Sequence, residues 1–259
     1  MRLKDKAIIV TGSTTGIGEA IARRCAAEGA RVLVHGRDEA RGRAVAASLG
    51  ARAVFHADDL VDPAAADRIV SAAIEAFGKL DALVNNAAWV PMSSIHTTDA
   101  ALFDRTMALN VRAPLLLVQK ALSHLSATRG CVLNIGSINE HSGESKLLAY
   151  SVSKGALRTL TRNLGDSLLK SHGVRVNQIS PGWVLTPNEM EKKQEHGLPP
   201  DWHEHLPEDL APTGKLLEPE VIAAAAVFLL GDESWPVTGT VLDAEQYPVT
   251  FRNPDKGDA

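Results

Sequence analysis

The chain has 259 residues, of which 45% are hydrophobic and 22% are charged, a composition that suits one large α/β domain with a substantial buried core. The formal net charge of -4 and the scattered placement of Lys and Arg argue against a nucleic-acid partner. No apolar run approaches the roughly 20 residues that span a bilayer, and the apolar run at the amino terminus is too short for a signal peptide. We therefore expect a cytoplasmic protein with no membrane partner.

The cysteines and histidines indicate neither a disulfide framework nor a metal centre. Cys25 falls in a predicted helix and Cys131 in a predicted strand, so both are interpreted as small buried side chains. The histidines and acidic residues do not follow HExxH or another ligand spacing, so we expect no bound metal.

The first predicted unit is a strand, a glycine loop and a helix. Residues 7–10 form a short apolar run, and a helical pattern follows the loop up to Glu28-Gly29. Such a unit can hold a diphosphate, because glycines allow close approach and the helix start offers unpaired N–H groups. The spacing is G-x3-G-x-G rather than the commoner G-x-G-x-x-G, and a plain surface turn is the alternative. The expected loop contacts are Gly12, Ser13, Thr14, Thr15, Gly16, Ile17 and Gly18.

The second predicted strand, residues 31–35, ends where a doubly wound fold reads the adenosine ribose. Position 36 is Gly and carries no carboxylate to accept from two ribose hydroxyls, whereas the guanidinium of Arg37 can fork onto a phosphate. This favours NADP, with NAD possible. In the alternative, Arg37 is a solvated turn residue and Asp38 turns back to the ribose.

The third predicted strand, residues 53–57, leads to an acidic turn, and a helix is expected to begin near Pro63. An acid there could bond an adenine amine, so Asp59 and Leu60 are candidate cofactor contacts. Capping of the next loop is the alternative.

The fourth predicted strand, residues 80–84, is closed by Asn85-Asn86-Ala87-Ala88. Small residues there allow close packing against a flat cofactor, so Asn86, Ala87 and Ala88 are candidate contacts. The amides could equally be structural. A long helix is predicted over residues 102–125, with a hydrogen-bond ladder interrupted around Asn110. A carbonyl freed there could hold a water.

The fifth predicted strand, residues 131–135, ends at Gly136-Ser137, and a phenol and an ammonium follow at Tyr150 and Lys154. Residues four apart share one helix face. Moving the pKa of a phenol from about 10 to about 7 requires roughly 4 kcal/mol in favour of phenolate. A cation about 5 Å away at an effective dielectric constant of about 20 supplies roughly 3 kcal/mol. We therefore expect Lys154 to lower the pKa of Tyr150; an ordinary helix face is the alternative.

The remaining pattern predicts a strand over residues 174–180, a helix over 219–230 and a last strand over 240–243. Between them, residues 187–212 are polar and contain several prolines, which is typical of a substrate lid. A solvated insertion is the alternative.

Taken in chain order, these motifs resemble the short-chain dehydrogenase/reductase family across nearly the whole chain. The residues that carry the resemblance are TGSTTGIG, NNAA, Asn110, Ser137, YSVSK and Pro181-Gly182 with Thr186. The resemblance implies an α/β fold with one doubly wound parallel sheet, a Rossmann fold, as a single NAD(P)-binding domain over residues 1–259. It also implies cofactor contacts from Tyr150, Lys154, Pro181, Gly182, Val184 and Thr186.

The resemblance assigns a catalytic tetrad. Tyr150 is the general acid/base, Ser137 orients and polarises a carbonyl, and Lys154 lowers the pKa of the tyrosine and binds the nicotinamide ribose. Asn110 holds the water of a proton relay through Lys154. The implied activity is hydride transfer between a nicotinamide and a secondary alcohol or ketone. The family commonly assembles through the helices carrying Asn110 and Tyr150, so we expect a homotetramer or homodimer, although an apolar stripe along the second of these helices also suits core packing.

Two departures from the family pattern matter. The chain has NNAA where the family often has NNAG, which tightens the floor near the nicotinamide by one methyl group. It also has Asp243-Ala244-Glu245 where the family often has Asp-Gly-Gly, which puts the usual subunit contacts in doubt, because the tail at Phe251 to Pro254 can run elsewhere.

The predicted substrate is a small polar compound such as a sugar, polyol or hydroxy acid, because amides, acids and indoles surround the expected site. The alternatives are a 3-oxoacyl thioester reductase, a lyase or epimerase that uses the cofactor transiently, and a non-catalytic dinucleotide-sensing regulator. The residues expected around the substrate are Asn139, Glu140, His141, Trp183, Asn188, Glu189 and Trp202. Glu140 and His141 could instead point to solvent.

Overall fold

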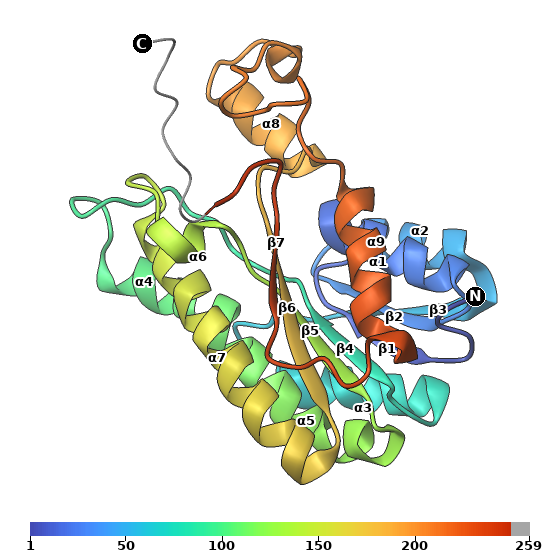
Figure 1. The fold of residues 1–259 in the computed structure, drawn as a ribbon. Coiled ribbons are helices and arrows are strands. Elements are labelled where there is room, and N and C mark those ends of the chain that lie inside the picture. The colour runs from blue at the N-terminus through green and yellow to red at the C-terminus, as the bar shows by residue number, and fades with distance from the viewer. Residues whose placement is uncertain (250–259) are drawn as a thin grey trace.

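A seven-stranded, fully parallel sheet forms the centre of the computed structural model, which describes residues 1–249 (Figure 1). Its strand order is β3-β2-β1-β4-β5-β6-β7. Strands β1 to β3 are added toward one edge of the sheet and β4 to β7 toward the other, so the order of addition reverses between β1 and β4. This is the doubly wound order that the sequence predicted. The strands are β1 (Ala7–Val10), β2 (Arg31–Gly36), β3 (Ala53–Ala57), β4 (Ala82–Asn85), β5 (Cys131–Ile135), β6 (Arg175–Pro181) and β7 (Val241–Ala244).

Continuous apolar runs form the central strands because both faces of the sheet are covered. All residues of β1 are buried, and Val10 lies opposite Val34 of β2 and Val84 of β4. Side chains alternate between the faces, so Ile8 packs into one hydrophobic cluster and its neighbour Ile9 into the other.

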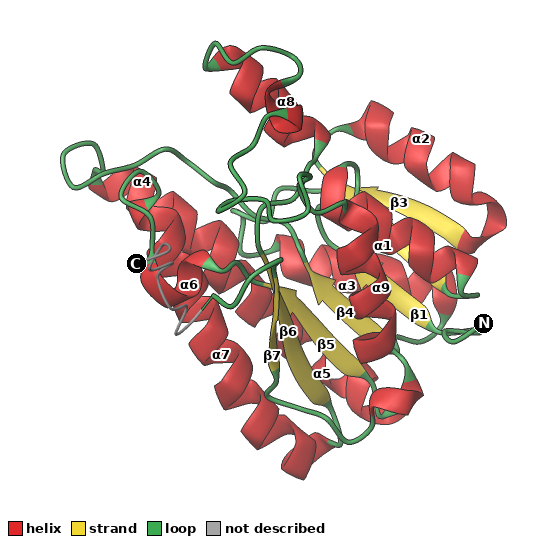
Figure 2. Ribbon diagram, turned by 45° about the horizontal axis from the view of Figure 1, so that its top comes forward, coloured by secondary structure: helices red, strands yellow, loops and turns green. Residues whose placement is uncertain are grey.

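Helices cover both faces of the sheet, as Figure 2 shows. One cluster packs α1, α2 and α9 against the sheet, and the other packs α3, α5 and α7 against the opposite face. The helices are α1 (Gly16–Ala27), α2 (Glu39–Leu49), α3 (Ala65–Phe77), α4 (Ala100–Met107), α5 (Ala113–Thr128), α6 (Asn139–Ser142), α7 (Leu148–His172), α8 (Pro187–Glu195) and α9 (Pro219–Leu230).

The helix predicted over residues 102–125 is interrupted, as expected. A π-helical segment, Ala108–Arg112, separates α4 from α5, and Pro114 follows it in the first turn of α5. Since Pro114 has no N–H to donate, the wider turn accommodates it without leaving a missing bond inside a regular α-helix.

The segment over residues 187–212 is more ordered than a loop. It begins with α8, whose first turn is capped by the Thr186 hydroxyl, and it contains a 3-10 turn at Trp202–Glu204. In Figure 1 it stands above the carboxyl ends of the strands, beside the top of β7.

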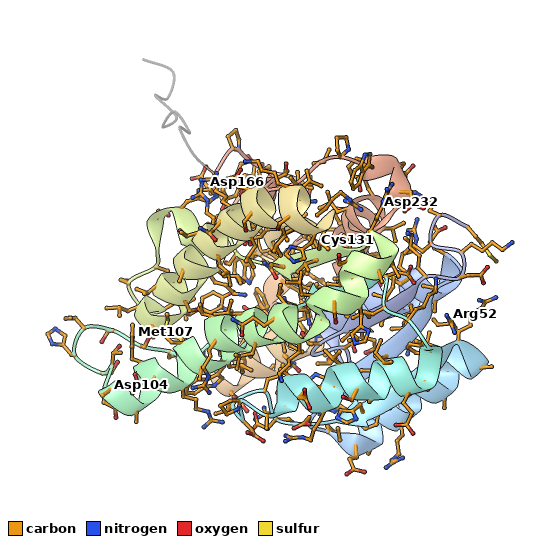
Figure 3. All side chains as sticks on the ribbon, turned by 90° about the horizontal axis from the view of Figure 1, so that it is seen from below. Arg52, Asp104, Met107, Cys131, Asp166 and Asp232 are labelled. Atoms are coloured by element: carbon orange, nitrogen blue, oxygen red, sulfur yellow. The ribbon has the colours of Figure 1, made fainter. Side chains whose placement is uncertain are left out.

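Both cysteines are buried and unpaired, Cys25 on α1 and Cys131 on β5, as predicted. Figure 3 places Cys131 well inside the molecule, whereas Arg52, Asp166 and Asp232 lie at its periphery. Among the described residues, none of the helices is both long enough and apolar enough to cross a bilayer. The predicted tail at Phe251 to Pro254 lies outside the described residues.

Candidate active site

A cavity of about 660 Å³ opens at the carboxyl ends of the strands, where the sheet reverses its order. That volume and that location are typical of a cofactor site in a doubly wound fold. Nearly all of the predicted cofactor contacts line it, together with Ser137. The predicted residues that do so are Gly12, Thr14, Thr15, Gly16, Ile17, Gly18, Arg37, Asp59, Leu60, Asn86, Ala87, Ala88, Tyr150, Lys154, Pro181, Gly182, Val184 and Thr186.

The glycine loop is shaped by close contacts as well as by backbone conformation. Gly12 has a φ of 62°, and a Cβ there would lie 2.8 Å from the Cα of Ala87. A Cβ on Gly18 would lie 2.3 Å from the carbonyl oxygen of Gly12. Asn86 holds the same loop, because its Nδ2 donates to the carbonyls of Thr11 at 2.9 Å and Gly12 at 3.0 Å. The amide of Asn86 is therefore structural and lines the cavity at the same time.

Ser13 is the exception in the predicted loop set. Its side chain is buried, donates to the carbonyl of Val10 at 2.6 Å and accepts from the backbone N–H of His35 at 3.0 Å. These bonds turn the hydroxyl into the protein and join the loop to β2, so Ser13 does not line the cavity and its predicted cofactor contact stays a prediction.

The adenosine end of the cavity is formed by the turns after β2 and β3. Arg37 is exposed and lines the cavity, whereas the carboxylate of Asp38 accepts from the backbone N–H of Arg41 and caps α2. A Cβ on Gly36 would lie 2.5 Å from Cγ2 of Thr14, so the threonine fills the space that a side chain at position 36 would need.

The acidic turn after β3 is held by its own partners. Asp58 accepts from Arg68 at 2.8 and 2.7 Å, and the Arg68 hydrogen bonds hold the pKa of that carboxyl below its usual value. Asp59 accepts from the backbone N–H of Val61 at 3.0 Å, which is the loop-capping alternative.

Tyr150 and Lys154 share one face of α7 and meet Ser137 in the cavity. Nζ of Lys154 donates to the carbonyl of Ile135 at 2.7 Å and lies 5.5 Å from the centroid of the Tyr150 ring. Burial lowers the pKa of Lys154 to about 8, with the nearby Glu140 opposing this effect.

The expected pKa of Tyr150 is corrected by the structure. Burial raises the pKa of this phenol to about 12; a hydrogen bond with Ser137 lowers it and the charge of Glu140 raises it further. The sequence predicted that Lys154 lowers this pKa; in the protein alone the pKa is raised instead, because the prediction omitted the loss of solvation and the carboxylate of Glu140.

Asn110 lies in the π-helical segment, behind the cavity wall. Its Oδ1 accepts from the backbone N–H of Trp89 at 2.9 Å, and its Nδ2 donates to the carbonyl of Trp89 and to Oγ of Ser153, both at 3.0 Å. Both amide hydrogens are therefore engaged by protein atoms, and the side chain fixes the loop that carries Trp89 into the cavity.

The end of the cavity beyond Tyr150 combines indoles with polar groups. Trp183, Asn188 and Glu189 line it, as the sequence predicted. Nε1 of Trp183 donates to Glu189 at 2.9 Å, and its ring stacks on Trp202 with centroids 5.3 Å apart. Trp202 therefore supports the wall without lining it.

The predicted substrate contacts Asn139, Glu140 and His141 do not line the cavity. The Glu140 side chain is fully buried and that of His141 is 8% exposed, so neither points to solvent as the alternative held. Both are turned toward β6 and β7, where they find polar partners.

Several lining residues were missed by the sequence analysis. Most of them neighbour a predicted contact along the chain, and that adjacency is the signal that could have found them. Lys192 is different, because it stands on α8, which the sequence analysis did not predict as a helix. The missed residues are His35, Gly36, Asp58, Trp89, Val90, Leu109, Ile135, Gly136 and Lys192.

Glu245, which belongs to the second departure from the family pattern, contacts the wall of the cavity. Oε2 of Glu245 accepts from the backbone N–H of Trp183 at 3.0 Å and would lie 1.7 Å from a Cβ on Gly182. Gln246 accepts from the hydroxyl of Thr213 and donates to the carbonyl of Lys215, so the chain after β7 is joined to the residues that directly follow the 187–212 segment.

Comparison with known proteins places these features in a family. The family model described as Enoyl-(Acyl carrier protein) reductase matches residues 12–246. An L-fucose dehydrogenase of Mus musculus is 36% identical over 90% of this chain and 85% of its own length. A galactitol 2-dehydrogenase of Agrobacterium fabrum is 34% identical over 90% of this chain and 93% of its own length.

A solved structure agrees with the sequence matches. The 3-ketoacyl-(acyl-carrier-protein) reductase of Brucella melitensis, complexed with NADH, is 30% identical and superimposes with a TM-score of 0.82, covering 93% of this chain and 97% of that one. The chain is therefore an oxidoreductase that belongs to the short-chain dehydrogenase/reductase family.

Proposed function

We propose that the protein transfers a hydride between NADP(H) and a secondary alcohol or ketone, and that its substrate is a small polyhydroxylated compound. The observation that carries this proposal is the meeting of Ser137, Tyr150 and Lys154 in one cavity with a glycine-lined cradle. A dinucleotide-sensing regulator needs the cradle but has no need for a proton donor beside it.

The residues present fit a nicotinamide dinucleotide. The start of α1 brings Gly16, Ile17 and Gly18 to the cavity wall, where free backbone N–H groups favour a diphosphate. Arg37 would take a 2′-phosphate, and the absence of a carboxylate at position 36 supports NADP over NAD. A bound nicotinamide would supply the hydride chemistry.

Tyr150 would donate its proton to the carbonyl oxygen during reduction and would accept a proton during oxidation. Ser137, which hydrogen-bonds Tyr150, would donate to the same oxygen and stabilise the negative charge that develops on it. Lys154 would hold a ribose hydroxyl and present a positive charge on the same helix face as Tyr150. Asn110 would take part in a water relay to Lys154 only by releasing one of its bonds to Trp89 or Ser153.

The polar far end of the cavity supports the substrate class. Indole faces suit the C–H surface of a sugar, while Asn188 and Glu189 offer a donor and acceptors for hydroxyl groups. The curated relatives include dehydrogenases of a sugar and of a polyol, which agrees with this interpretation.

A second candidate is reduction of a 3-oxoacyl thioester. The similarity to a solved 3-ketoacyl-(acyl-carrier-protein) reductase favours it. Glu189 in the cavity wall weighs against it, because a long acyl chain requires an apolar wall.

Assembly as a homotetramer or homodimer through α5 and α7 remains part of the proposal. Val152 of α7 is 47% exposed, and Leu160 is partly buried on the same helix, so this surface retains apolar area for a second copy. Other residues of the predicted stripe, such as Leu157 and Leu168, are buried in the monomer. A cytoplasmic location stays a prediction from the sequence.

The test is a screen of the purified protein with NADPH and NADH against sugars, polyols, a short 3-oxoacyl thioester and a steroid ketone, followed by nicotinamide absorbance. We expect the highest kcat/KM with a polyhydroxylated compound and NADP(H). A hundredfold preference for either apolar class would refute the substrate class, and a lack of net cofactor turnover with all of them would refute the activity.

A further inference from the structure

A buried chain of polar side chains runs beneath the active site and ends on Glu140. Nδ2 of Asn85 donates to Oδ1 of Asn134 at 2.9 Å, and Nδ2 of Asn134 donates to Oγ1 of Thr161 at 2.8 Å. Oγ1 of Thr161 lies 2.8 Å from Oε1 of Gln178, and Nε2 of Gln178 donates to Oε2 of Glu140 at 2.5 Å. The chain thus crosses from β4 through β5, α7 and β6 to α6.

The bonds around Glu140 identify it as the acceptor at which this chain ends. Oγ of Ser180 lies 2.9 Å from Oε1 of Glu140 and donates to it, since a carboxylate only accepts. A Cβ on Gly136 would lie 2.3 Å from Nε2 of Gln178 and 2.7 Å from Oε2 of Glu140, so the group packs tightly under the backbone next to Ser137.

Glu140 also contacts the backbone of Ser137. Oε2 of Glu140 lies 3.5 Å from the backbone N–H of Ser137, and Oγ of Ser137 accepts from the backbone N–H of Asn139 at 3.2 Å. The backbone N–H of Glu140 donates to the carbonyl of Ser137 at 3.0 Å, so the two residues share the turn that leads into α6. Ser137 therefore contacts Asn139 and Glu140 of α6, and Glu140 in turn is hydrogen-bonded by residues of β6.

The charged neighbours of Glu140 come from α7 and from α6 itself, whereas β6 contributes only neutral partners. Arg158 of α7 approaches its carboxylate at 3.7 Å and His141 of α6 at 3.9 Å. After the larger effect of burial, the charge of Glu140 raises the pKa of Tyr150 further and opposes the lowering of the pKa of Lys154. Burial raises the pKa of Glu140 itself.

The neighbouring trio of Glu140, His141 and Asp243 does not support a metal site. Nδ1 of His141 accepts from Arg158 at 3.0 Å, because a guanidinium only donates, and Nε2 therefore carries the proton that faces Asp243 at 2.9 Å. Both ring nitrogens are engaged, so the histidine has no free lone pair to offer.

We infer that Glu140 is a positioning residue for the reaction: its carboxylate holds the backbone N–H of Ser137 and presents a negative charge near Tyr150 and Lys154. The inference rests on the proposed function, because it assigns Ser137 and Tyr150 their roles there. Glu140 is not one of the four tetrad residues, and it would affect the reaction only through its contacts with them.

The test compares Glu140→Gln, Gln178→Glu and the double variant that exchanges the two residues, with Glu144→Gln as a matched control. Glu144 is an exposed acid of the same loop, so its substitution removes one negative charge without touching Gln178. In Glu140→Gln one of the two acceptor oxygens becomes an NH2 group and the negative charge is lost, and we expect kcat to fall about 10- to 100-fold, the loss of one hydrogen bond to a charged group. The pH profile of alcohol oxidation should move to lower pH, since removal of the negative charge favours the phenolate.

The exchange variant distinguishes an effect of Glu140 on the position of Ser137 from an effect on the stability of the protein. A carboxylate at position 178 and an amide at 140 restore their mutual bond, so the thermal midpoint should recover. The amide at 140 still turns an NH2 group toward the backbone N–H of Ser137, so kcat should stay low. Recovery of kcat together with the thermal midpoint, or wild-type kcat and pH profile in Glu140→Gln, would overturn the inference. An inactive wild-type protein would refute the proposed function instead, and stability loss in the single variants would still report on the buried chain.

Discussion

Replacement of Gly36 by Asp should change cofactor choice only when Thr14 is shortened as well. A carboxylate at position 36 could accept from the 2′- and 3′-hydroxyls of NAD and repel the 2′-phosphate of NADP. The structure adds a steric term, because a Cβ at position 36 would lie 2.5 Å from Cγ2 and 3.0 Å from Oγ1 of Thr14. In the single variant this overpacking should lower the free energy of unfolding by about 1–3 kcal/mol.

Thr14→Ala removes both of the close atoms. The nearest remaining pair is Cβ of Thr14 and the new Cβ at position 36, 3.4 Å apart, which is an ordinary contact. In the double variant two charge-assisted hydrogen bonds to the ribose should contribute about 3 kcal/mol, which corresponds to a change of about 150-fold in preference toward NAD. The matched control is Arg37→Ala, which should lower kcat/KM for NADP while leaving NAD nearly unchanged.

The assay measures kcat/KM for NADP and NAD with one polyol, together with the thermal midpoint of each variant. The expected pattern is a destabilised single Gly36→Asp variant and a recovered, NAD-preferring double variant. The reasoning would be refuted by a single variant that melts at the wild-type temperature and prefers NAD as strongly as the double variant. Equal losses with both cofactors in Arg37→Ala would make that residue a structural turn residue.

Three further predictions test the site and its supports. Tyr150→Phe should lower kcat by about 10²- to 10⁴-fold while the dissociation constant of the dinucleotide stays unchanged; retention of a tenth of the activity would exclude the phenol as the acid. Trp202→Ala removes the ring that stacks on Trp183, so KM for the substrate should rise at least about tenfold with dinucleotide binding preserved, and an unchanged KM would refute this support. Arg68→Ala should raise the pH of acid unfolding, because the depressed pKa of Asp58 gives stability that is present above its usual pKa of 3.8 and is lost as pH falls; an unchanged acid midpoint would contradict this.

The fold could be predicted because its signals are local and repeated. Apolar runs such as residues 7–10 and 131–135 form buried parallel strands, and the glycine loop marks where the first strand turns into a helix. The break near Asn110 was predicted from the presence of Asn110 and Pro114 inside an otherwise helical pattern. The helix α8 was missed because its residues are mostly polar and lack an apolar face, and contacts such as that of Trp183 with Glu189 position it instead.

The candidate site was predictable in its chemistry but less so in its geometry. A motif names the residue types that meet a cofactor, but it does not say which way each side chain turns. Ser13 stands in the middle of the glycine loop, and only the partners of its hydroxyl, Val10 and His35, show that it faces the protein. The crowding of position 36 by Thr14 joins residues from two loops, so no local pattern contains it.

The pKa of Tyr150 depends most strongly on its burial in the fold, which its sequence neighbours do not reveal. A pairwise estimate with Lys154 gives a phenol titrating near neutrality, but burial and the carboxylate of Glu140 both favour the neutral form, and the pKa rises to about 12. A phenol with that pKa keeps its proton throughout the physiological range, which suits donation to a carbonyl oxygen. Oxidation of an alcohol requires the opposite, a phenol that accepts a proton, and additional positive charge beside the ring favours that state. In the protein alone, burial and the charge of Glu140 thus both favour the protonated phenol.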